Sequence, residues 1–538
     1  MQGYEAIPEL IRRNGLPVVF TMLAHTNAPW LGHGAESGAF RLIKTRHEET
    51  AVGAATSFTR VTGKLGVVSV QRGPGFANSV NALLAASHCH SPLLLIVAES
   101  PATKELSAKN IDQKGFSALI GAGFHHVAEA HELESAFSDA LQSARWNGAP
   151  QVLSIGDGVL DAVVELSEGS DVATSTDADD IDVDSIRSVI DVLEKADRPL
   201  VIAGQGAIIA DCKDEVIRFG DRIGAGFATS LYATQFFSGH PRNLGVCGTW
   251  APTAALNAIA EADVIVGVGA SLNRYTTAEN SVLAGKKVIH IEVDIDRPIM
   301  ASPQELAVLG DARAVVEALV KEWDSRGLGV REPARPWPSL SEVKASMMKV
   351  DLGHDPSRGL DLRSAVAAFD ERLPAERIIV TDSGRHMAPL PTLLGAPDAR
   401  SWIVSRGYGS VGLGISAALG AATASTEKKV VLFCGDGGFM MGAQGLDCFR
   451  INDLDATIVI LNDELYGAEV GCLRKYGLST DIAHQTLPRI DLYAESLGGR
   501  GVVVRTFDDI AALDLNSPGL LFVDVRLDPE VNNFGAVG

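Results

Sequence analysis

Residues 430–467 read VVLFCGDGGFMMGAQGLDCFRINDLDATIVILNDELYG, and this stretch decides the fold of the chain. The apolar runs at 430–433 and 456–461 each predict a buried strand. Apolar residues recur at helical spacing between the two runs: Phe439, Leu446 and Phe449. A strand, a helix and a second strand in this order predict a parallel pair joined by a crossover. Asp436 and Asp463, which follow the two strands, are therefore expected at the same carboxyl edge of one sheet, where ligands bind.

The residues at this edge have the chemistry of a metal–phosphate site. Gly437 and Gly438 have no side chains, so the backbone there can approach a phosphate closely. The carboxylates of Asp436 and Asp463 are hard oxygen ligands, and these suit Mg²⁺, which shares its coordination shell with phosphates. The stretch therefore predicts a Mg²⁺–diphosphate site.

The composition limits the class of protein. A chain of 538 residues is too long for one hydrophobic core and predicts about three domains. The formal net charge of −21 argues against nucleic acid or an anionic membrane as partner. The six cysteines are scattered without metal-ligand spacing, which indicates reduced thiols. Because the sequence shows neither a signal-peptide pattern nor an apolar run of membrane-spanning length, we expect a cytoplasmic location.

Two stretches have the composition of exposed connectors. Residues 166–185 are acidic and rich in serine and threonine, and residues 325–357 are rich in proline and charge. They divide the chain into three expected domains: 1–165, 183–325 and 358–538. Each third alternates β-branched runs with alanine- and leucine-rich helical segments. This pattern predicts an α/β fold in which each domain is an open, mostly parallel sheet flanked by helices.

Three motifs of the N-terminal third follow one another in a fixed order: Arg46-His47-Glu48, Arg60-Val61-Thr62-Gly63-Lys64, and Gly73-Pro74-Gly75 with Asn78. Together they resemble the pyrimidine-binding domain of thiamine diphosphate (ThDP) enzymes of the acetolactate synthase and 2-oxo acid decarboxylase superfamily, which includes pyruvate decarboxylase and benzoylformate decarboxylase. No gap is needed between Arg46 and Asn78. The Gly-Asp-Gly motif at 435–437, with the Asn-Asp pair that follows at 462–463, resembles the ThDP motif of the same enzymes. The resemblance covers nearly the whole chain.

The resemblance places the catalytic glutamate of these enzymes on Glu48. A carboxyl group that hydrogen-bonds the pyrimidine N1′ favours the imino tautomer, whose 4′-nitrogen then removes the proton from C2 of the thiazolium. Gly75 and Asn78 are then expected to line the cofactor pocket. Glu49 is interpreted as an ordinary acidic residue at the start of a helix, where the helix dipole favours negative charge.

The C-terminal third is expected to hold the other half of the cofactor. The turn after a predicted strand resembles the family segment whose backbone binds the diphosphate: Ser383, Gly384, Arg385 and His386. The segment at 405–414 resembles the one below the bent cofactor. The resemblance places Val411 between the two rings, where its shape imposes the bend, and the carbonyl of Gly409 at the 4′-amino group.

The resemblance also implies a set of metal ligands. These are the carboxylates of Asp436 and Asp463 and the backbone carbonyl of Leu465. Asp463 departs from the family, in which the second residue of the pair is usually asparagine. Four further residues are expected around the cofactor: Gly437, Gly438, Tyr466 and Gly467.

Four residues are candidates for contact with the substrate or for proton transfer: His25, Glu469, Gln71 and Gln113. His25 takes the position of a substrate-facing Asp or Ser, in a loop that lacks the Pro-Gly of the decarboxylases. Glu469 takes the position of an active-site glutamate of enzymes like pyruvate decarboxylase. A structural interpretation stands beside each of these, such as a helix-start acid for Glu469.

The middle third resembles the central domain of the family, which has a nucleotide-binding-like fold. Gly204 and Gly206 follow a predicted strand and form a weak dinucleotide-binding signal. In some relatives this domain holds FAD, ADP or CoA, and in others it is only structural. We expect a structural role here, with FAD possible but not predicted.

These resemblances imply a ThDP- and Mg²⁺-dependent enzyme that cleaves or forms a C–C bond next to a carbonyl group. The most direct expectation is decarboxylation of a 2-oxo acid, carboligation as in acetolactate synthase, or both. Three alternatives stay open: a lyase or hydrolase of an acyloin or cyclic diketone, a flavin-dependent oxidase, and a degenerate ThDP-binding regulatory subunit. In this family each site takes its pyrimidine half from one subunit and its diphosphate half from another. We therefore expect a homodimer or homotetramer.

Overall fold

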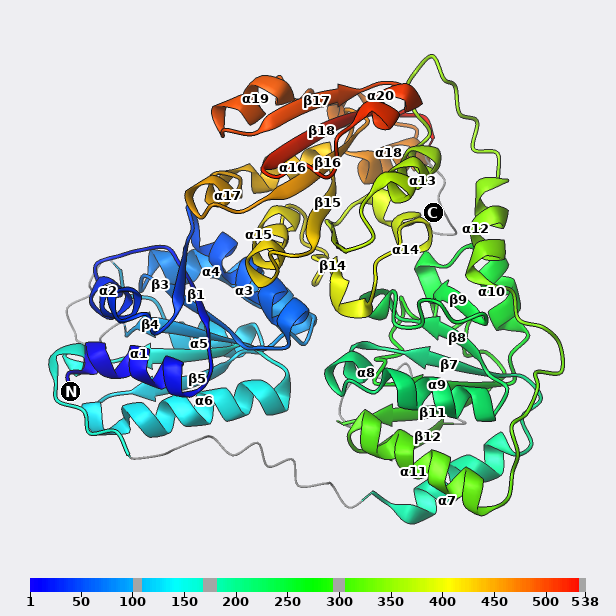
Figure 1. The fold of residues 1–538 in the computed structure, drawn as a ribbon, viewed down its shortest axis with the longest axis horizontal. Coiled ribbons are helices and arrows are strands. Elements are labelled where there is room, and N and C mark those ends of the chain that lie inside the picture. The colour runs from blue at the N-terminus through cyan, green and yellow to red at the C-terminus, as the bar shows by residue number, and fades with distance from the viewer. Residues whose placement is uncertain (100–108, 168–180, 294–304, 532–538) are drawn as a thin grey trace.

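The computed structural model describes residues 1–99, 109–167, 181–293 and 305–531. These residues form three six-stranded sheets, and every pair of neighbouring strands is parallel (Figure 1). The expected fold class, three α/β domains with parallel sheets, is confirmed. The six strands of each sheet lie inside the three expected domain ranges, and the boundaries themselves stay a prediction.

The first sheet has the strand order β2-β1-β3-β4-β6-β5. Its strands are β1 (Val18–Thr21), β2 (Arg41–Lys44), β3 (Gly66–Val70), β4 (Leu93–Ala98), β5 (Gly123–Val127) and β6 (Gln151–Ile155). The helices around it are α1 (Gly3–Arg13), α2 (Ala28–Ser37), α3 (Glu48–Thr62), α4 (Pro74–His88), α5 (Gln113–Leu119) and α6 (Leu133–Asn147), with the 3₁₀ turns η1 (Ala130–Glu132) and η2 (Val159–Asp161).

The central sheet has the order β12-β11-β10-β7-β8-β9. Its strands are β7 (Pro199–Ala203), β8 (Gly226–Thr229), β9 (Asn243–Val246), β10 (Val264–Val268), β11 (Lys287–Glu292) and β12 (Glu305–Leu309). Its helices are α7 (Val183–Leu193), α8 (Gln205–Ile209), α9 (Lys213–Arg222), α10 (Thr253–Ala260) and α11 (Ala312–Ser325), with η3 (Leu231–Ala233) and η4 (Gly248–Trp250). Read from its far edge, this is the order of the dinucleotide-binding fold.

The third sheet has the order β14-β13-β15-β16-β18-β17. Its strands are β13 (Arg377–Thr381), β14 (Trp402–Val404), β15 (Lys429–Gly435), β16 (Ala456–Asn462), β17 (Arg500–Val504) and β18 (Leu520–Arg526). Its helices are α13 (Leu362–Arg372), α14 (Leu390–Leu393), α15 (Gly414–Ala424), α16 (Asp436–Gly442), α17 (Asp447–Ile451), α18 (Gly467–Lys475), α19 (Ile490–Ser496) and α20 (Phe507–Ala512). Four 3₁₀ turns complete it: η5 (Arg385–Met387), η6 (Ala399–Ser401), η7 (Ala443–Gly445) and η8 (Asp481–Ala483).

The first and third sheets have the same topology. Counted within its own sheet, each runs second, first, third, fourth, sixth and fifth strand. Helix α3 follows the second strand of the first sheet, and α15 follows the second strand of the third sheet. These two equivalent helices pack directly on each other between the domains (Figure 1).

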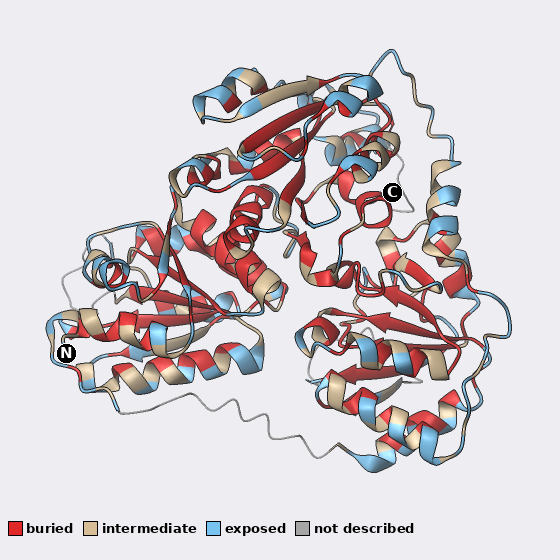
Figure 2. Ribbon diagram, viewed as in Figure 1, coloured by how far each residue is buried: buried red, intermediate tan, exposed pale blue. Residues whose placement is uncertain are grey.

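The contact between α3 and α15 depends on small residues. A Cβ atom on Gly53 would lie 2.2 Å from Oγ of Ser416, and one on Gly420 would lie 2.0 Å from the carbonyl oxygen of Ala54. Helix α15 is buried along nearly its whole length (Figure 2). One apolar core therefore runs from the first domain into the third, and it fixes the two domains against each other inside one chain.

The connector before the third domain is only partly exposed. It contains helix α12 (Leu340–Met348), which begins with a capping box between Ser339 and Glu342. Val343 is fully buried, and the ring of Trp337 stacks under the guanidinium of Arg198 at 3.8 Å. The prediction of an exposed connector is wrong at these positions, because apolar residues among the prolines dock on the central domain. Residues 168–180 of the other connector lie outside the described residues.

Two further expectations concern cysteines and membranes. All six cysteines are free thiols, five of them buried. In the described part of the chain, no helix combines the length and the apolar character needed to cross a membrane.

Candidate functional site at the edges of the outer sheets

The two candidate metal-binding carboxylates follow adjacent strands of the third sheet. Strands β15 and β16 are parallel neighbours, and Gly435 pairs with Leu461. Asp436 is the first residue of α16, and Asp463 comes directly after β16. The expectation that both residues lie at one carboxyl edge is confirmed. The predicted helix between the strands is broken into α16, η7 and α17, and Gly442 lies where a Cβ would meet the carbonyl oxygen of Gly412 at 2.4 Å.

The carboxyl group of Asp436 is buried, and only one of its two oxygens accepts a hydrogen bond within the described structure. Its Oδ1 accepts a hydrogen bond from the backbone N–H of Gly437 at 2.8 Å. Its Oδ2 is buried and has no partner among the described residues. Burial, and then the negative charge of Asp463, raise the pKa of Asp436 to about 7. A bound cation would satisfy this oxygen and favour the ionised form, so the carboxyl fits the predicted role of a metal ligand.

The turn after β16 places Asp463 and Leu465 next to Asp436. We call the region of these three residues the candidate metal corner. Glu464 has a left-handed backbone with φ +57°, which is uncommon for a residue other than glycine. Oδ1 of Asp463 accepts from the N–H of Leu465 at 3.0 Å. Leu465 forms a bridge with His484, and its carbonyl accepts no hydrogen bond from the described residues. Asn462 instead supports the turn, donating to Oδ1 of Asp524 at 2.7 Å.

No group of three or more His, Cys, Asp or Glu side chains suited to a metal is found among residues 1–99, 109–167, 181–293 and 305–531. The corner offers two carboxylates and one carbonyl oxygen, so a cation held there would need further oxygens from a ligand. That is the way Mg²⁺ is held in phosphate sites.

The glycines after Asp436 are packed closely by the groups around them. A Cβ on Gly437 would lie 2.8 Å from the ring of Tyr466 and 3.0 Å from Nε2 of Gln485. A Cβ on Gly438 would lie 2.4 Å from Oδ2 of Asp382. Nε2 of Gln485 is a buried donor without a partner in the described structure, which makes it a candidate anion contact that the sequence did not reveal.

Asp382 is a second residue that sequence reasoning missed. It follows β13 directly, is 1% exposed, and accepts hydrogen bonds from the N–H of Gly412 at 2.9 Å and from Oγ of Ser405 at 3.2 Å. Burial raises the pKa of Asp382 to about 6. Asp382 therefore holds the loop that carries Gly409 and Val411. An acidic residue directly after a buried strand was the available signal.

The predicted diphosphate turn lies beside this aspartate. Ser383 and His386 are buried, and Gly384 and Arg385 are half-buried. A ring nitrogen of His386 lies 3.2 Å from the carbonyl oxygen of Asp382, and burial lowers the pKa of His386 to about 4. The imidazole is therefore neutral at pH 7. The guanidinium of Arg385 donates to Oδ2 of Asp463, and the close contact with Arg385 leaves no room for a Cβ on Gly467.

The loop between β14 and α15 projects Gly409 and Val411 outward. Val411 is 39% exposed, although the residues after it are buried. One of its methyl groups would lie 3.4 Å from a Cβ on Gly438. Gly409 has φ +108°, which few other residues adopt, and its surroundings are open. The loop therefore offers a free backbone and an apolar side chain beside the glycines that follow Asp436.

Glu48, Gly75 and Asn78 lie together in the first domain. Glu48 is the first residue of α3, is half-buried, and accepts a hydrogen bond from Nδ2 of Asn78 at 3.1 Å. A Cβ on Gly75 would lie 3.0 Å from Oε1 of Glu48. The next residue, Glu49, accepts instead from Nδ2 of Asn81 at 2.7 Å.

Asn81 joins the first domain to the loop of the third. Its Nδ2 also donates to Oγ of Ser410 at 3.1 Å, and its Oδ1 accepts from the hydroxyl group of Tyr408. Ser410 lies between Gly409 and Val411 in the sequence. Asn81 thus links the first turn of α3 to the candidate cofactor loop within one chain. Sequence reasoning missed Asn81 because its partners lie more than three hundred residues away.

The candidate substrate residues occupy different environments. His25 is exposed in the turn after β1, and Gln71 follows the adjacent strand β3, where it accepts a hydrogen bond from Oγ1 of Thr26 at 2.5 Å. Glu469 is exposed in the first turn of α18. Gln113 is 4% exposed, donates to the carbonyl oxygen of Ala98 and accepts from Ser154. Its role in substrate binding stays a prediction, as do those of the other three.

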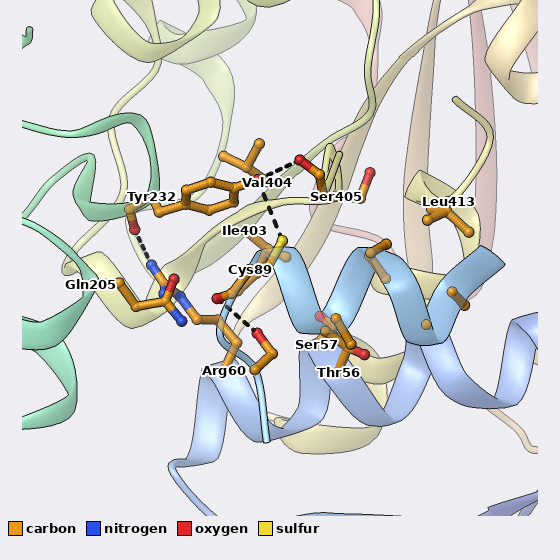
Figure 3. Close-up of a pocket in the computed structure, with 17 residues that line it drawn as sticks. Thr56, Ser57, Arg60, Cys89, Gln205, Tyr232, Ile403, Val404, Ser405 and Leu413 are labelled. Atoms are coloured by element: carbon orange, nitrogen blue, oxygen red, sulfur yellow. Dashed lines mark hydrogen bonds between the residues drawn. The ribbon is translucent and has the colours of Figure 1, made fainter. Parts of the chain in front are cut away.

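A separate cavity of about 50 Å³ lies where the three domains meet (Figure 3). It is lined by Arg60, Cys89, Gln205, Tyr232 and Ser405, among others, and Arg60 donates to the carbonyl oxygen of Tyr232. A buried water needs roughly 10–15 Å³, so this space has room for a few water molecules and is too small for a cofactor. None of the candidate acidic residues lines it.

The loops at the switch point of the central sheet are joined to each other. The N–H of Gly204 donates to the carbonyl oxygen of Val268, and the N–H of Gly206 donates to that of Gly269, both at 2.9 Å. Backbone N–H groups at this position bind the pyrophosphate in dinucleotide-binding folds. Because these two are engaged with the protein, the geometry favours a structural role for the central domain.

The fold and the site define a class of protein. It is a three-domain α/β protein whose outer domains share one topology, pack on each other through α3 and α15, and carry a candidate cation–phosphate site at the carboxyl edge of the third sheet. Comparisons with known proteins agree with this class. Three family models match: the N-terminal TPP binding domain of thiamine pyrophosphate enzymes over residues 1–119, their central domain over 186–319, and their C-terminal TPP binding domain over 382–525. The chain belongs to the thiamine pyrophosphate enzyme family.

Similar proteins match along nearly the whole chain. The acetolactate synthase large subunit of Haemophilus influenzae is 25% identical, over 98% of this chain and 95% of that protein. The acetolactate synthase isozyme 1 large subunit of Escherichia coli K12 is 26% identical, over 98% of this chain and 94% of its own length. The sulfoacetaldehyde acetyltransferase of Alcaligenes xylosoxydans is 23% identical, over 95% of this chain and 89% of that protein. These relatives establish ThDP-dependent chemistry at C–C bonds as the family's activity, and identities this low leave the individual reaction open.

Proposed function

We propose that this protein is a ThDP- and Mg²⁺-dependent enzyme that decarboxylates a 2-oxo acid, ligates the product to a second carbonyl compound, or does both. The observation that carries the proposal is the unpaired, buried Oδ2 of Asp436, which lies beside Asp463 at the carboxyl edge of the third sheet. A buried carboxylate oxygen without a partner costs free energy unless a ligand satisfies it.

The described residues fit the cofactor at both ends. Asp436, Asp463 and the carbonyl of Leu465 would hold the metal ion, and the backbone at 383–386 with Gly437 and Gly438 would hold the diphosphate. Val411 would support the bend between the rings, and Gly409 would offer its carbonyl to the amino group. Tyr466 and Gly467 would lie beside the diphosphate, next to Gly437 and Arg385.

When bound, ThDP would supply a nucleophilic carbon for a substrate carbonyl group and an electron sink for cleavage of the adjacent bond. Glu48 holds the proton at the pyrimidine nitrogen, and Asn78 orients its carboxyl group through the hydrogen bond at 3.1 Å. His25 and Glu469 are exposed titratable groups, and we assign them to proton transfer with the substrate. Gln71 and Gln113 are the candidates for orienting it.

A screen of carbonyl substrates tests this function. The protein is incubated with ThDP, Mg²⁺ and a series of 2-oxo acids, alone and with aldehydes or sulfoacetaldehyde as second substrates, and both CO₂ and acyloin products are measured. We expect CO₂ from at least one 2-oxo acid, and none when Mg²⁺ is chelated. If no 2-oxo acid releases CO₂ but an acyloin or cyclic diketone is cleaved, the lyase or hydrolase alternative replaces the proposal. Binding of ThDP without turnover of any of these compounds would point to a regulatory subunit.

We further propose that the protein works as a homodimer or homotetramer with active sites at subunit boundaries. The family resemblance supports this assembly.

A further inference from the structure

The candidate metal corner contains a buried ion pair between Arg385 and Asp463. Nη2 of Arg385 donates to Oδ2 of Asp463. The two side chains are only 16% and 9% exposed. Arg385 reaches Asp463 from the turn after β13, whereas Asp463 follows β16, so the pair joins two strand ends on either side of β15.

The ion pair stands next to a second carboxylate. Asp436, 3% exposed, lies beside Asp463 and has a buried oxygen that no described residue satisfies. Two buried carboxylates without a cation would repel each other strongly, because the surroundings screen little charge. With both carboxylates ionised and Arg385 included, the three side chains carry a net charge of −1. That is the charge of a site with one carboxylate and two neutral residues.

The chain makes room for this arginine. A Cβ on Gly467 would lie 2.3 Å from Nε of Arg385 and 2.4 Å from its Cδ, so only glycine fits there without displacing the guanidinium. Nη1 of Arg385 is buried and has no partner in the described part of the chain. A guanidinium has five N–H donors in a rigid fork. One arm therefore serves Asp463, and the other is available to an anion.

We propose that Arg385 is the counter-ion that allows a carboxylate at position 463 to serve as a metal ligand, and that its free arm binds a phosphate oxygen of the cofactor. Arg385 and Asp463 are thus one functional unit: when one of them is replaced, the charge of the other is left uncompensated and weakens the binding of the cofactor. This inference rests on the proposed cofactor and deepens it.

A double-mutant cycle tests the unit without requiring turnover. The apoproteins of wild type, Arg385→Gln, Asp463→Asn and the double variant are titrated with ThDP in the presence of Mg²⁺ by calorimetry. Each single variant is expected to bind at least about tenfold more weakly, because each leaves a buried charge uncompensated. The double variant is expected to bind at least about tenfold more tightly than the product of the single effects.

A second readout follows the apoproteins alone. Each single variant is expected to lower the melting temperature, and the double variant to recover part of the loss, since the net charge of the corner is restored. Arg385→Lys keeps the positive charge but loses the two-armed guanidinium group. We therefore expect its melting temperature to stay near that of wild type while its affinity for ThDP falls. The matched control is Arg474→Gln on the same domain, which removes an exposed pair with Glu530 at 2.8 Å and is expected to leave ThDP binding unchanged.

Two results would overturn the inference. One is single effects that simply multiply in the double variant, and the other is a single variant that binds ThDP–Mg²⁺ as tightly as wild type. Both measurements remain valid if no 2-oxo acid is turned over, so a failure of the proposed reaction and a failure of this unit can be told apart.

Discussion

At the scale of single residues, two adjacent glutamates at the start of α3 have separate partners. Glu48 is held by Asn78, and Glu49 by Asn81. If Glu48 is the acid–base group, Glu48→Gln should lower kcat by about 100-fold or more. Glu49→Gln keeps a similar side chain at the domain contact and should retain most of the activity. Steady-state kinetics on the best substrate of the screen checks both variants, and equal losses would remove Glu48 from its assigned role.

Asp382 predicts a pH dependence of stability. Its pKa in the fold, about 6, lies above its ordinary value of 3.8 because the carboxyl group is buried. The folded state therefore binds the proton more tightly than the unfolded state does. This contribution to stability is complete below pH 3.8 and is lost as the pH rises through about 6, by roughly 3 kcal/mol at most.

Asp382→Asn removes this titration while keeping an acceptor for the N–H of Gly412. We expect the melting temperature of the variant, minus that of wild type, to increase between pH 4 and pH 7. Thermal unfolding of the apoproteins across this range measures the difference. Asp139→Asn, at an exposed position of α6, is the control and should give a flat difference. A flat difference for Asp382→Asn as well would contradict the argument.

The sequence located residues that follow predicted strands better than residues whose partners are distant. Asp436 and Asp463 could be placed at one edge because buried apolar runs end directly before them. Asn81 and Gln485 could not be recognised, since each acts through a loop remote in sequence, whereas Asp382 could have been found by the signal that located Asp436, an acidic residue directly after a buried strand. The hydrogen bond from Asn81 to Ser410, for example, exists only because two domains pack together.

At the scale of elements, the fit of α3 against α15 holds the outer domains together. Gly420→Ala would place a methyl group 2.0 Å from the carbonyl oxygen of Ala54, so the helices must separate. We expect a loss of about 1–3 kcal/mol in stability, as for other overpacked cores. Gly471→Ala is the matched control, in an exposed part of α18 where a Cβ meets nothing within 4 Å, and it should stabilise by about 0.5–1 kcal/mol.

Thermal unfolding compares the two variants. A melting temperature of Gly420→Ala equal to that of wild type would show that the helices adjust without cost.

The strands and the connector show which elements could be predicted from the sequence pattern. The apolar runs at 430–433 and 456–461 became strands β15 and β16, which extend at most two residues beyond the predicted ends, because a buried parallel strand is apolar throughout. The connector before the third domain was misjudged, because the docking of Trp337 and Val343 is a tertiary event.

At the scale of the whole molecule, the equivalence of the outer domains explains the position of the candidate site. The first and third sheets have one topology, and each has candidate cofactor residues at its carboxyl edge. The equivalent helices α3 and α15 pack on each other between the two domains. The central domain differs in strand order, and its switch-point amides are used internally. A bent cofactor with two chemically different ends suits two such edges, one with Glu48 and one with Asp436.

The assembly of the sites can be tested with mixed subunits. Glu48→Gln and Asp436→Asn variants with different tags are co-expressed, and the hybrid oligomers are purified through both tags. Each variant alone is expected to be inactive. If sites form at subunit boundaries, as proposed, a hybrid contains one site with both residues intact, and turnover should return. The alternative is a site completed within one chain, which the contact between Asn81 and Ser410 inside one chain would favour. If each chain completes its own site, every site in the hybrid lacks Glu48 or Asp436, and the hybrids stay inactive.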